Sequence, residues 1–117
     1  MHSRRRGKEK LRNFYGSIFI NRDELRAAGI DYPIKVEYYK LTNENEIPVT
    51  NKSIFGIQVI KTEYKEKIGV EQSKIENITN NEKEINNILK QLKEYEVTPV
   101  GLEDVIIEIE EDINSAV

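Results

Sequence analysis

The spacing of the apolar residues changes once along this chain, from every second residue to every third or fourth. Ile34, Val36 and Tyr38 alternate with residues of other kinds, which is the pattern of a strand with one buried face. After residue 80 the apolar residues recur at the three- and four-residue spacing of one helix face. Because strands come first and helices follow, we predict an α+β domain, with a small antiparallel sheet followed by two helices.

Four segments have the composition of strands, because they are rich in aromatic and β-branched residues. The first spans residues 14–20, and the others span 33–41, 54–65 and 67–78. The stretch Lys65–Gly69 between the last two has the length of a hairpin connection. The simplest arrangement of these segments is an antiparallel meander of three to four strands.

A short helix is predicted over residues 22–28, between the first two strands. Asn21 can cap its start, and Asp23 and Glu24 lie in the first turn, where the helix dipole favours acidic residues. Gly29 suits the left-handed conformation that ends many helices.

Two longer helices are predicted at the end of the chain. One spans roughly residues 81–95, where Thr79 and Glu82 have the spacing of a capping box. The other follows Thr98-Pro99, which has the form of a cap and a first-turn proline. Its apolar stripe consists of Leu102, Val105, Ile106, Ile109 and Ile113. The alternation of Val105, Ile107 and Ile109 also permits a strand here.

Charge is distributed unevenly along the chain. Residues 1–40 hold ten Lys and Arg against five acids, a balance of +5, and the remaining residues hold eight against sixteen, a balance of −8, which together give the net charge of −3. Residues 1–13 lack periodic apolar residues, so we expect a flexible basic arm ahead of one domain spanning 14–117. A polyanion would be attracted to the first third of the chain and repelled by the last.

The residue types present exclude several kinds of chemistry. The chain has no cysteine, and His2 is its only histidine, so zinc sites and nucleophiles activated by histidine are excluded. The six glycines form no phosphate-binding motif. We therefore expect no enzyme activity, no cofactor and no metal. The acidic run in the last helix is interpreted as a solvated face; it consists of Glu103, Asp104, Glu108, Glu110, Glu111 and Asp112.

The apolar runs of the chain are short. Val105-Ile106-Ile107 is far below the ~20 residues that span a bilayer, and no apolar stretch of signal-peptide length follows Arg4–Arg6. We therefore expect a cytoplasmic protein with no membrane partner.

Four tyrosines are candidates for binding aromatics, namely Tyr38, Tyr39, Tyr64 and Tyr95. Tyrosines in strands and on an amphipathic helix are more often core or cross-strand residues, and that is our expectation for these four.

The basic arm is the strongest functional feature of the sequence. Six Lys or Arg lie within residues 4–12 with one acid among them, which suits salt-sensitive contacts to phosphates. Arg22 and Arg26 lie four residues apart on the short helix and would extend this patch if they point the same way as the arm. The predicted nucleic-acid-binding residues are Arg4, Arg5, Arg6, Lys8, Lys10, Arg12, Arg22 and Arg26.

Two resemblances cover different parts of the chain. "GSIFINRDELRAAGI" and the following "DYPIKVEYYKLTNENEIPV", about residues 14–48, resemble the AbrB/MazE-like swapped-hairpin DNA-binding family. That resemblance implies a homodimer of interleaved strands that presents Arg12, Arg22 and Arg26 to DNA. The chain has Asn21 where that family usually has proline, and Ser17 where it usually has a basic residue.

The second resemblance covers residues 35–107. "VEYYKL", "FGIQVIK", "IENIT" and "INNILKQLKEYEVTPVGLEDVI" look like an uncharacterised family of short clostridial-type proteins with a domain of unknown function. It implies that the meander and two helices form a unit, with residues 1–34 as an addition. The two resemblances compete for residues 34–47, which would pair within the meander in one case and in a swapped hairpin in the other.

These features predict a non-enzymatic binding protein. Our leading hypothesis is a dimeric DNA-binding or regulatory protein that uses its basic arm and first short helix. The alternative is a protein-binding adaptor or inhibitor that acts through its acidic C-terminal helices or a sheet edge.

Overall fold

The computed structural model describes residues 10–44 and 53–115, without the side chains of residues 10, 22, 44, 53 and 112–115. Its elements are, in order, β1 (Lys10–Phe19), α1 (Arg22–Ala27), β2 (Ile34–Glu44), β3 (Ser53–Glu63), β4 (Gly69–Thr79), α2 (Glu82–Glu94), a 3₁₀ turn η1 (Pro99–Gly101) and α3 (Leu102–Ser115). Four strands followed by helices confirm the α+β prediction.

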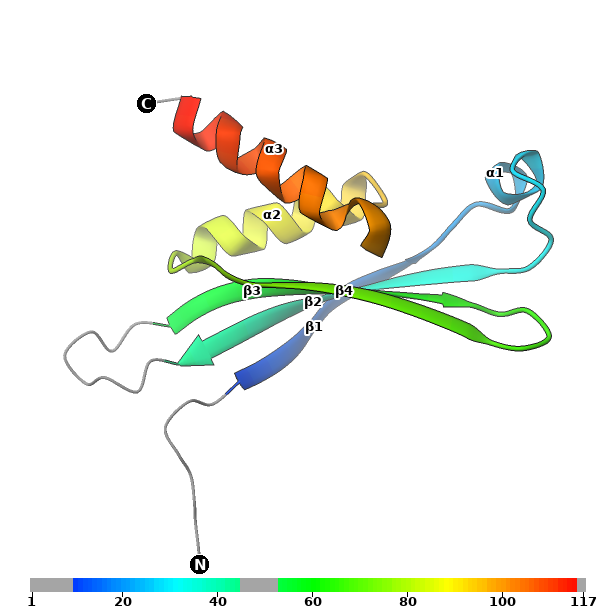
Figure 1. Cartoon of the computed structure of the whole chain (residues 1–117), viewed down its shortest axis with the longest axis horizontal. Helices are drawn as coiled ribbons and strands as arrows, with labels where there is room; N and C mark the ends of the chain where they lie inside the picture. Colours follow the sequence, from blue (N-terminus) through cyan, green and yellow to red (C-terminus); the bar gives the residue numbers. More distant parts are fainter. Residues whose placement is uncertain (1–9, 45–52, 116–117) are drawn as a thin grey trace, which may run out of the picture.

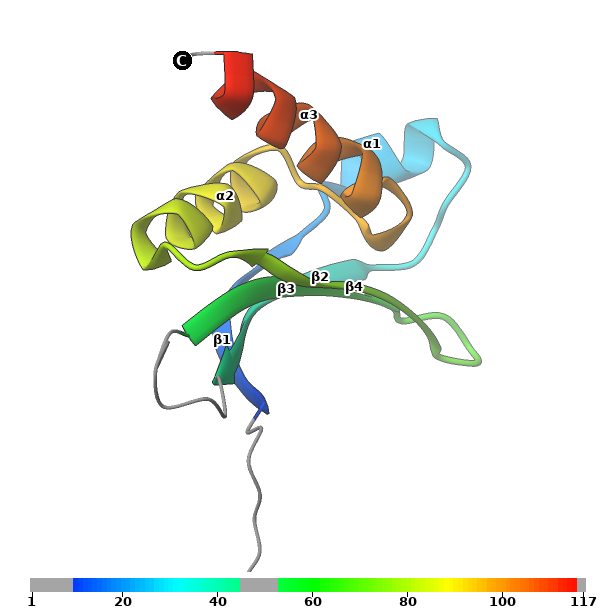
Figure 2. The same ribbon diagram turned by 60° about the vertical axis from the view of Figure 1, so that its left-hand side comes forward.

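The four strands form one antiparallel sheet in the order β1-β2-β3-β4, which confirms the meander. β2 pairs with β1 on one side and with β3 on the other, all within the same chain. The meander pairing of β2 with β3 is therefore present, beside a pairing of β2 with β1 in the same chain, while strand exchange with a second chain stays a prediction. Figures 1 and 2 show β3 and β4 bowing toward the helices.

The core lies between the sheet and α2 and α3, which pack on one of its faces (Figures 1 and 2). Strand alternation directs every second side chain to this side, which we call the covered face. Val36, Tyr38, Ile57 and Val59 are fully buried there. The helices contribute their apolar stripes, and the largest fully buried helix residues are Ile85, Ile88, Leu89, Leu92, Leu102 and Ile106.

The short helix α1 lies on the same side of the sheet, at the end where β1 connects to β2 (Figure 1). Asn21 caps it by accepting a hydrogen bond from the backbone N–H of Asp23 at 2.7 Å, as predicted. Gly29 follows with φ of 79°, in the left-handed region that favours glycine. Leu25 anchors the helix to the core.

The start of α2 differs from the prediction, because Thr79 does not cap it. Thr79 ends β4, and its hydroxyl accepts from the backbone N–H of Asn81 at 3.1 Å. Asn81 is the capping residue, since its side chain accepts from Glu84 N–H at 3.1 Å. Asn81 directly precedes the first helical residue, so it takes the cap in place of Thr79.

The last segment of the chain forms a helix, α3. The alternation of Val105, Ile107 and Ile109, which also permitted a strand, therefore does not produce one.

Two further expectations changed with the structure. Tyr95, expected on the buried face of its helix, is the C-terminal cap of α2 and is 74% exposed, and Tyr64 is exposed as well. β1 begins at Lys10 and not at residue 14, so residues 10–13 of the expected arm pair with β2. Residues 1–9 lie outside the described part of the chain.

Candidate nucleic-acid interface

The second face of the sheet carries the candidate site. No described element covers this face, which we call the open face, and the residues that alternate with the covered core point to it. Strand β1 contains a bulge, because Phe14 pairs with Tyr39 and Gly16 with Tyr38, which leaves Tyr15 without a partner in β2. A bulge reverses the alternation of a strand, so Arg12, Phe14 and Phe19 all share the open face.

Arg12 and two aromatic rings form a cluster on this face. The Arg12 guanidinium carbon lies 4.4 Å from the centroid of the Tyr39 ring. Phe14 meets the same ring edge-to-face, with centroids 5.6 Å apart. Phe14 is 58% exposed, so its outer surface remains available for stacking. We call these three residues the aromatic–arginine cluster.

Hydrogen bonds connect this cluster across the sheet to β4. Arg12 Nη1 donates to Gln58 Oε1 at 3.2 Å, and Gln58 Nε2 donates to Gln72 Oε1 at 2.7 Å. Gln58 is only 9% exposed although it lies on the open face. The two bonds fix the orientation of the Gln58 amide and hold the guanidinium over the tyrosine.

A second cation–aromatic pair lies toward the α1 end of the open face. Lys35 Nζ is 6.0 Å from the centroid of the Phe19 ring, and these residues are register partners. Leu41 is the register partner of Arg12, and Lys35 lies six residues before Leu41 in β2. The two cation–aromatic pairs are therefore about 20 Å apart along the strands. Glu37 lies between the two pairs, 3.9 Å from Lys35 Nζ, and offsets part of their positive charge.

The surroundings of the tyrosine in the cluster raise the pKa of its hydroxyl. Burial raises the pKa of the Tyr39 hydroxyl, and the hydrogen bond that it donates to Glu37 Oε2 at 3.1 Å raises the pKa further. Arg12 opposes this shift because its positive charge favours the phenolate. A neutral phenol ring is the form that stacks on a base without repelling its phosphates.

The structure separates the predicted site residues into two groups. Arg12 lies in the first half of β1, whereas Arg26 is exposed on α1, beyond the other end of the strand (Figure 1). Seven strand residues lead from Arg12 to Phe19, roughly 23 Å of chain. The two arginines therefore do not share one patch. Arg26 instead lines a separate hollow of about 190 Å³ with Phe19, Tyr32 and Pro33.

The remaining predicted residues are less fully placed. Lys10 opens β1 and Arg22 opens α1, but their side chains are not among those described. The other four, Arg4, Arg5, Arg6 and Lys8, lie outside the described residues.

Some residues of the candidate interface were not among the predicted site residues. The sequence predicts Phe14 and Lys35 only as strand residues and Tyr39 as a core or cross-strand residue, and it assigns no role to Gln58. The signal was present in β2, where the alternation that buries Tyr38 places Lys35 and Tyr39 on the opposite face. The bulge in β1 is marked only by Gly16, which does not give the pairing register, so the sequence did not show that Arg12 shares this face.

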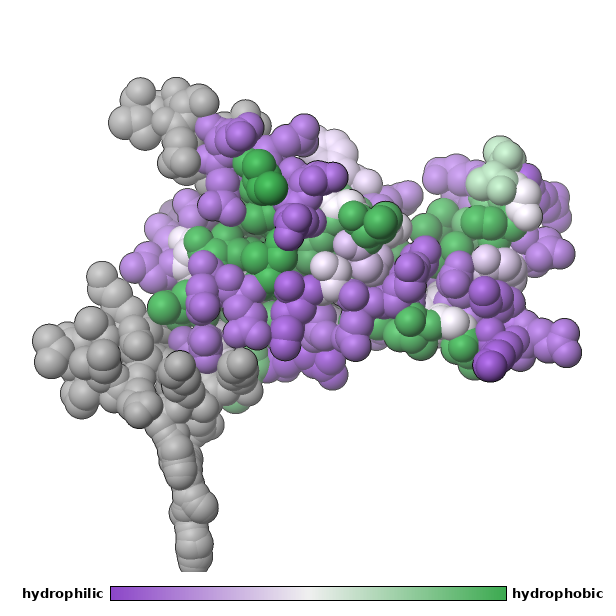
Figure 3. Space-filling model, viewed as in Figure 1, coloured by the Kyte–Doolittle hydropathy of each residue, from purple (hydrophilic) through white to green (hydrophobic). Residues whose placement is uncertain are grey.

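The side of the molecule with β4 in front carries both polar and apolar surface. Hydrophilic side chains form a band over β4, and hydrophobic ones gather above it around α2 and α3 (Figure 3). The acidic side chains of α3 that are described, at positions 103, 104, 108, 110 and 111, are exposed, as predicted for a solvated face.

Among the described residues, no group of His, Cys, Asp and Glu side chains could hold a metal ion. None of the helices found in residues 10–44 and 53–115 is long and apolar enough to span a bilayer.

The fold defines a small α+β protein, a four-stranded antiparallel meander with helices on one face and an open second face. The chain matches the model of the family of unknown function DUF6514 over residues 18–112, and it belongs to that family. The match begins at residue 18, so α1 and the end of β1 are part of the family's domain, and residues 18–34 are not an addition to it. No curated protein and no solved structure matches the chain.

Proposed function

We propose that this protein binds nucleic acid and acts by binding, without catalysing a reaction. The basic residues that precede and open β1 contact phosphates, and the open face receives a single strand whose bases stack on its aromatic rings. The contact residues are Arg4, Arg5, Arg6, Lys8, Lys10 and Arg12, with Arg22 and Arg26 as a second contact at the far end of β1.

The observation that carries this proposal is the position of Arg12. It is the last basic residue of the run that starts at Arg4, and its guanidinium lies over the Tyr39 ring beside Phe14. The run of positive charge therefore leads directly onto exposed aromatic surface. Proteins that bind single strands combine these two features, a cationic track for the backbone and rings for the bases.

A single strand fits this surface better than a duplex. The aromatic rings of the open face stack only on bases that are unpaired, because the faces of bases in a duplex are already stacked. Lys35 and Phe19 provide a second stacking position along the same strands. The proposed path runs along β1 and β2, from the arm toward α1.

Fluorescence anisotropy with a short labelled single strand tests the proposal at about 50 and about 200 mM salt. We expect binding that weakens with salt, and a duplex of the same sequence should bind less tightly. Replacing Arg4, Arg5 and Arg6 by glutamine should reduce the salt dependence, by about 0.7 in log–log slope for each lost phosphate contact. Absence of binding at the lower salt would contradict the proposal.

A matched variant controls for the loss of net charge. Lys67, Lys83 and Lys90 are exposed, on the β3–β4 turn and on α2, away from the aromatic–arginine cluster. Replacing these three by glutamine removes the same charge as the arm variant. If both triple variants weaken binding equally, general attraction and not a defined interface accounts for it.

The dimeric form of the hypothesis is also open to test. The resemblance to the AbrB/MazE-like family implies that two chains exchange strands. In this structure β1 and β2 instead pair within one chain, over the nine residue pairs from Lys10↔Asn43 to Phe19↔Lys35. A swapped dimer would form the same pairs between chains. Light scattering after size exclusion distinguishes a dimer from a monomer, and a cytoplasmic location stays a prediction.

A second candidate function is the binding of a protein partner to the same face. Phe14, Phe19 and Val70 are exposed apolar residues of the sheet that a protein partner could cover. Under this alternative, oligonucleotides fail to bind, and Phe14→Asp loses a protein partner that the wild type retains after nuclease treatment.

A further inference from the structure

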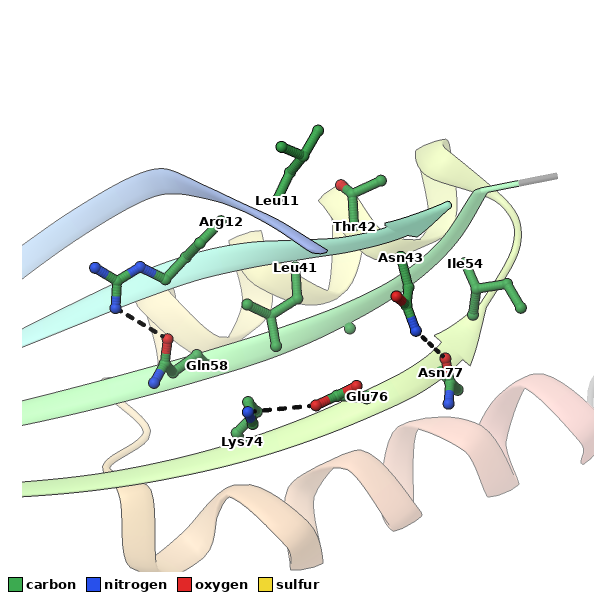
Figure 4. A pocket seen from close by; sticks show the side chains of 11 residues that line it. Leu11, Arg12, Leu41, Thr42, Asn43, Ile54, Gln58, Lys74, Glu76 and Asn77 are labelled. Atoms are coloured by element: carbon green, nitrogen blue, oxygen red, sulfur yellow. Dashed lines mark hydrogen bonds and ion pairs between the residues drawn. The ribbon is translucent and has the colours of Figure 1, made fainter. Parts of the chain in front are cut away.

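The open face contains a hollow of about 160 Å³ beside Arg12 (Figure 4). Leu41 and Ile54 form apolar walls, Gln58 closes one side and Asn43 the other, while Leu11 points away from the hollow. Ligand pockets for drug-sized molecules are usually at least twice as large, so this volume suits one small ring system.

The hollow exists because β4 is irregular where it passes β3. Ile57 pairs with Ile75 and Phe55 with Thr79, so β4 advances four residues while β3 advances two. The extra residues include Asn77, whose φ of 58° lies in the left-handed region. Such bulges re-aim side chains and are common next to functional sites.

Glycine at position 56 is required beneath this bulge. A Cβ on Gly56 would collide with the carbonyl oxygen of Ile75 and would lie 2.8 Å from the Cα of Glu76. The backbone of β4 therefore approaches β3 more closely than any side chain allows. Gly56 is one of the residues lining the hollow, so this close approach lies at its wall.

Asn43 contributes an unused hydrogen-bond acceptor. Its side-chain N–H group donates to Asn77 Oδ1 at 3.4 Å, while its own Oδ1 is buried and has no hydrogen-bond partner among the described residues. A buried carbonyl oxygen without a donor is costly, and it gains a full hydrogen bond when a ligand supplies an N–H. Asn43 is one of the residues lining the hollow.

We infer that the hollow holds one nucleobase of the bound single strand, with a base N–H donating to Asn43 Oδ1. This inference rests on the proposed function and specifies which part of the ligand the open face recognises. Leu41 and Ile54 contact the ring, and the Arg12 guanidinium at the rim faces the adjoining phosphate. The exposed Phe14 ring stacks on the next base, while Tyr39 supports Phe14 and Arg12 from below.

Three probes of equal length separate this inference from the proposed function: oligothymidylate, the same strand with N3-methylthymine, and an abasic strand. Thymine has one N–H donor, at N3, and methylation removes it. We expect the methylated strand to bind roughly three- to tenfold more weakly, the effect of one hydrogen bond. The abasic strand, which keeps the phosphates, should bind more weakly still.

Each outcome decides one of the two statements. If all three strands bind equally, nucleic-acid binding stands and the base site is wrong. If none binds, the proposed function fails and this inference fails with it. The expected order of affinities supports both.

A variant places the effect at Asn43. Asn43→Ala should bind the thymine and N3-methylthymine strands equally, because the acceptor is gone, whereas Asn87→Ala on the exposed side of α2 should retain the discrimination. In the wild type, nuclear magnetic resonance signals of the Asn43 side-chain amide should shift with oligothymidylate and not with the abasic strand. Unchanged Asn43 signals in a strand-bound protein would overturn the inference.

Discussion

Tyr38 and Tyr39 are neighbours in β2, but the two faces of the sheet give them different surroundings. Tyr38 points to the covered face, is fully buried, and donates its hydroxyl proton to the carbonyl oxygen of Val97 at 2.8 Å. Tyr39 points to the open face, where it contacts Arg12 and Phe14. The same residue type thus connects the sheet to the helices on one side and forms part of the proposed binding surface on the other.

This difference indicates which residues the fold needs. The covered face and the apolar stripes of α2 and α3 supply the buried core, and the fold depends on them. The aromatic and basic side chains of the open face remain partly exposed, so we expect the core to depend on them less. The predictions below test whether stability and binding divide between the two faces in this way.

The largest effect on stability is expected from the covered side. Leu89→Ala removes a fully buried side chain of α2 and should lower the free energy of unfolding by about 2–5 kcal/mol. Phe14→Ala on the open face should cost less than about 1 kcal/mol, because the ring is mostly exposed. Urea denaturation measures both. Equal losses would mean that the open face belongs to the core.

Gly56→Ala should have the next largest effect, although it lies on the open face. Its Cβ has no room beneath the backbone of Ile75 and Glu76, so the bulge must shift at a cost of about 1–3 kcal/mol. Gly101→Ala is the matched control, because a Cβ there meets nothing within 4 Å and should change stability little. A Gly56→Ala protein as stable as the control would contradict the tight crossing of β3 and β4.

The two tyrosines give a direct comparison between the faces. Tyr38→Phe leaves the buried Val97 carbonyl without its donor and should cost about 1–3 kcal/mol. Tyr39→Phe loses a hydrogen bond to the partly exposed Glu37 and should cost no more than about 0.5 kcal/mol. Thermal denaturation of the two variants checks the order, and the reverse order would be inconsistent with the assigned faces.

Alkaline pH should weaken the fold through Tyr38. Burial raises the pKa of Tyr38 above its ordinary value of 10.0, so the folded chain holds this proton more tightly than the unfolded chain does. The resulting stability is complete below about pH 10 and is lost as the pH rises further. Tyr38→Phe should show a shallower loss of stability above pH 10; an identical profile would contradict it.

The smallest effect is expected at the ion pair between Lys61 and Glu71. Their charged atoms lie 2.8 Å apart, and the hydrogen bond from Lys61 lowers the pKa of Glu71. Because the Glu71 side chain is 58% exposed, Glu71→Gln should cost no more than about 0.5 kcal/mol at neutral pH. This contribution should disappear as the pH falls below about 4.5, the ordinary pKa of the glutamate. A larger loss would show that the pair is more shielded from water than its exposure indicates.

Much of the fold could be predicted because local patterns and tertiary packing agree. Ile34, Val36 and Tyr38 alternate in the sequence and face the core together, and Asn21 and Gly29 cap and end α1 as expected. The sequence did not reveal the start of β1. Residues 10–13 have no apolar alternation, and a bulge at Tyr15 reverses what pattern remains, so only pairing with β2 defines the strand.

The candidate site was less predictable than the fold, for a physical reason. A run of charge such as Arg4–Arg6 is visible in a sequence, but a surface is formed by residues from several strands. The contact between Arg12 and Tyr39 depends on the register of β1 against β2, and the hollow depends on an irregularity between β3 and β4. A glycine inside an apolar strand, such as Gly56, often marks a bulge or a close backbone approach, but neither it nor Asn77 indicates which two strands meet there.

One titration tests most directly whether the open face binds and the covered face holds the fold. Backbone amide spectra of ¹⁵N-labelled protein are recorded as a short single strand is added. We predict that the amide signals of residues around Arg12, Phe14, Tyr39 and Gln58 shift and that those of the buried residues of α2 stay unchanged. Shifts confined to α2 and α3, or no shifts at all, would contradict it.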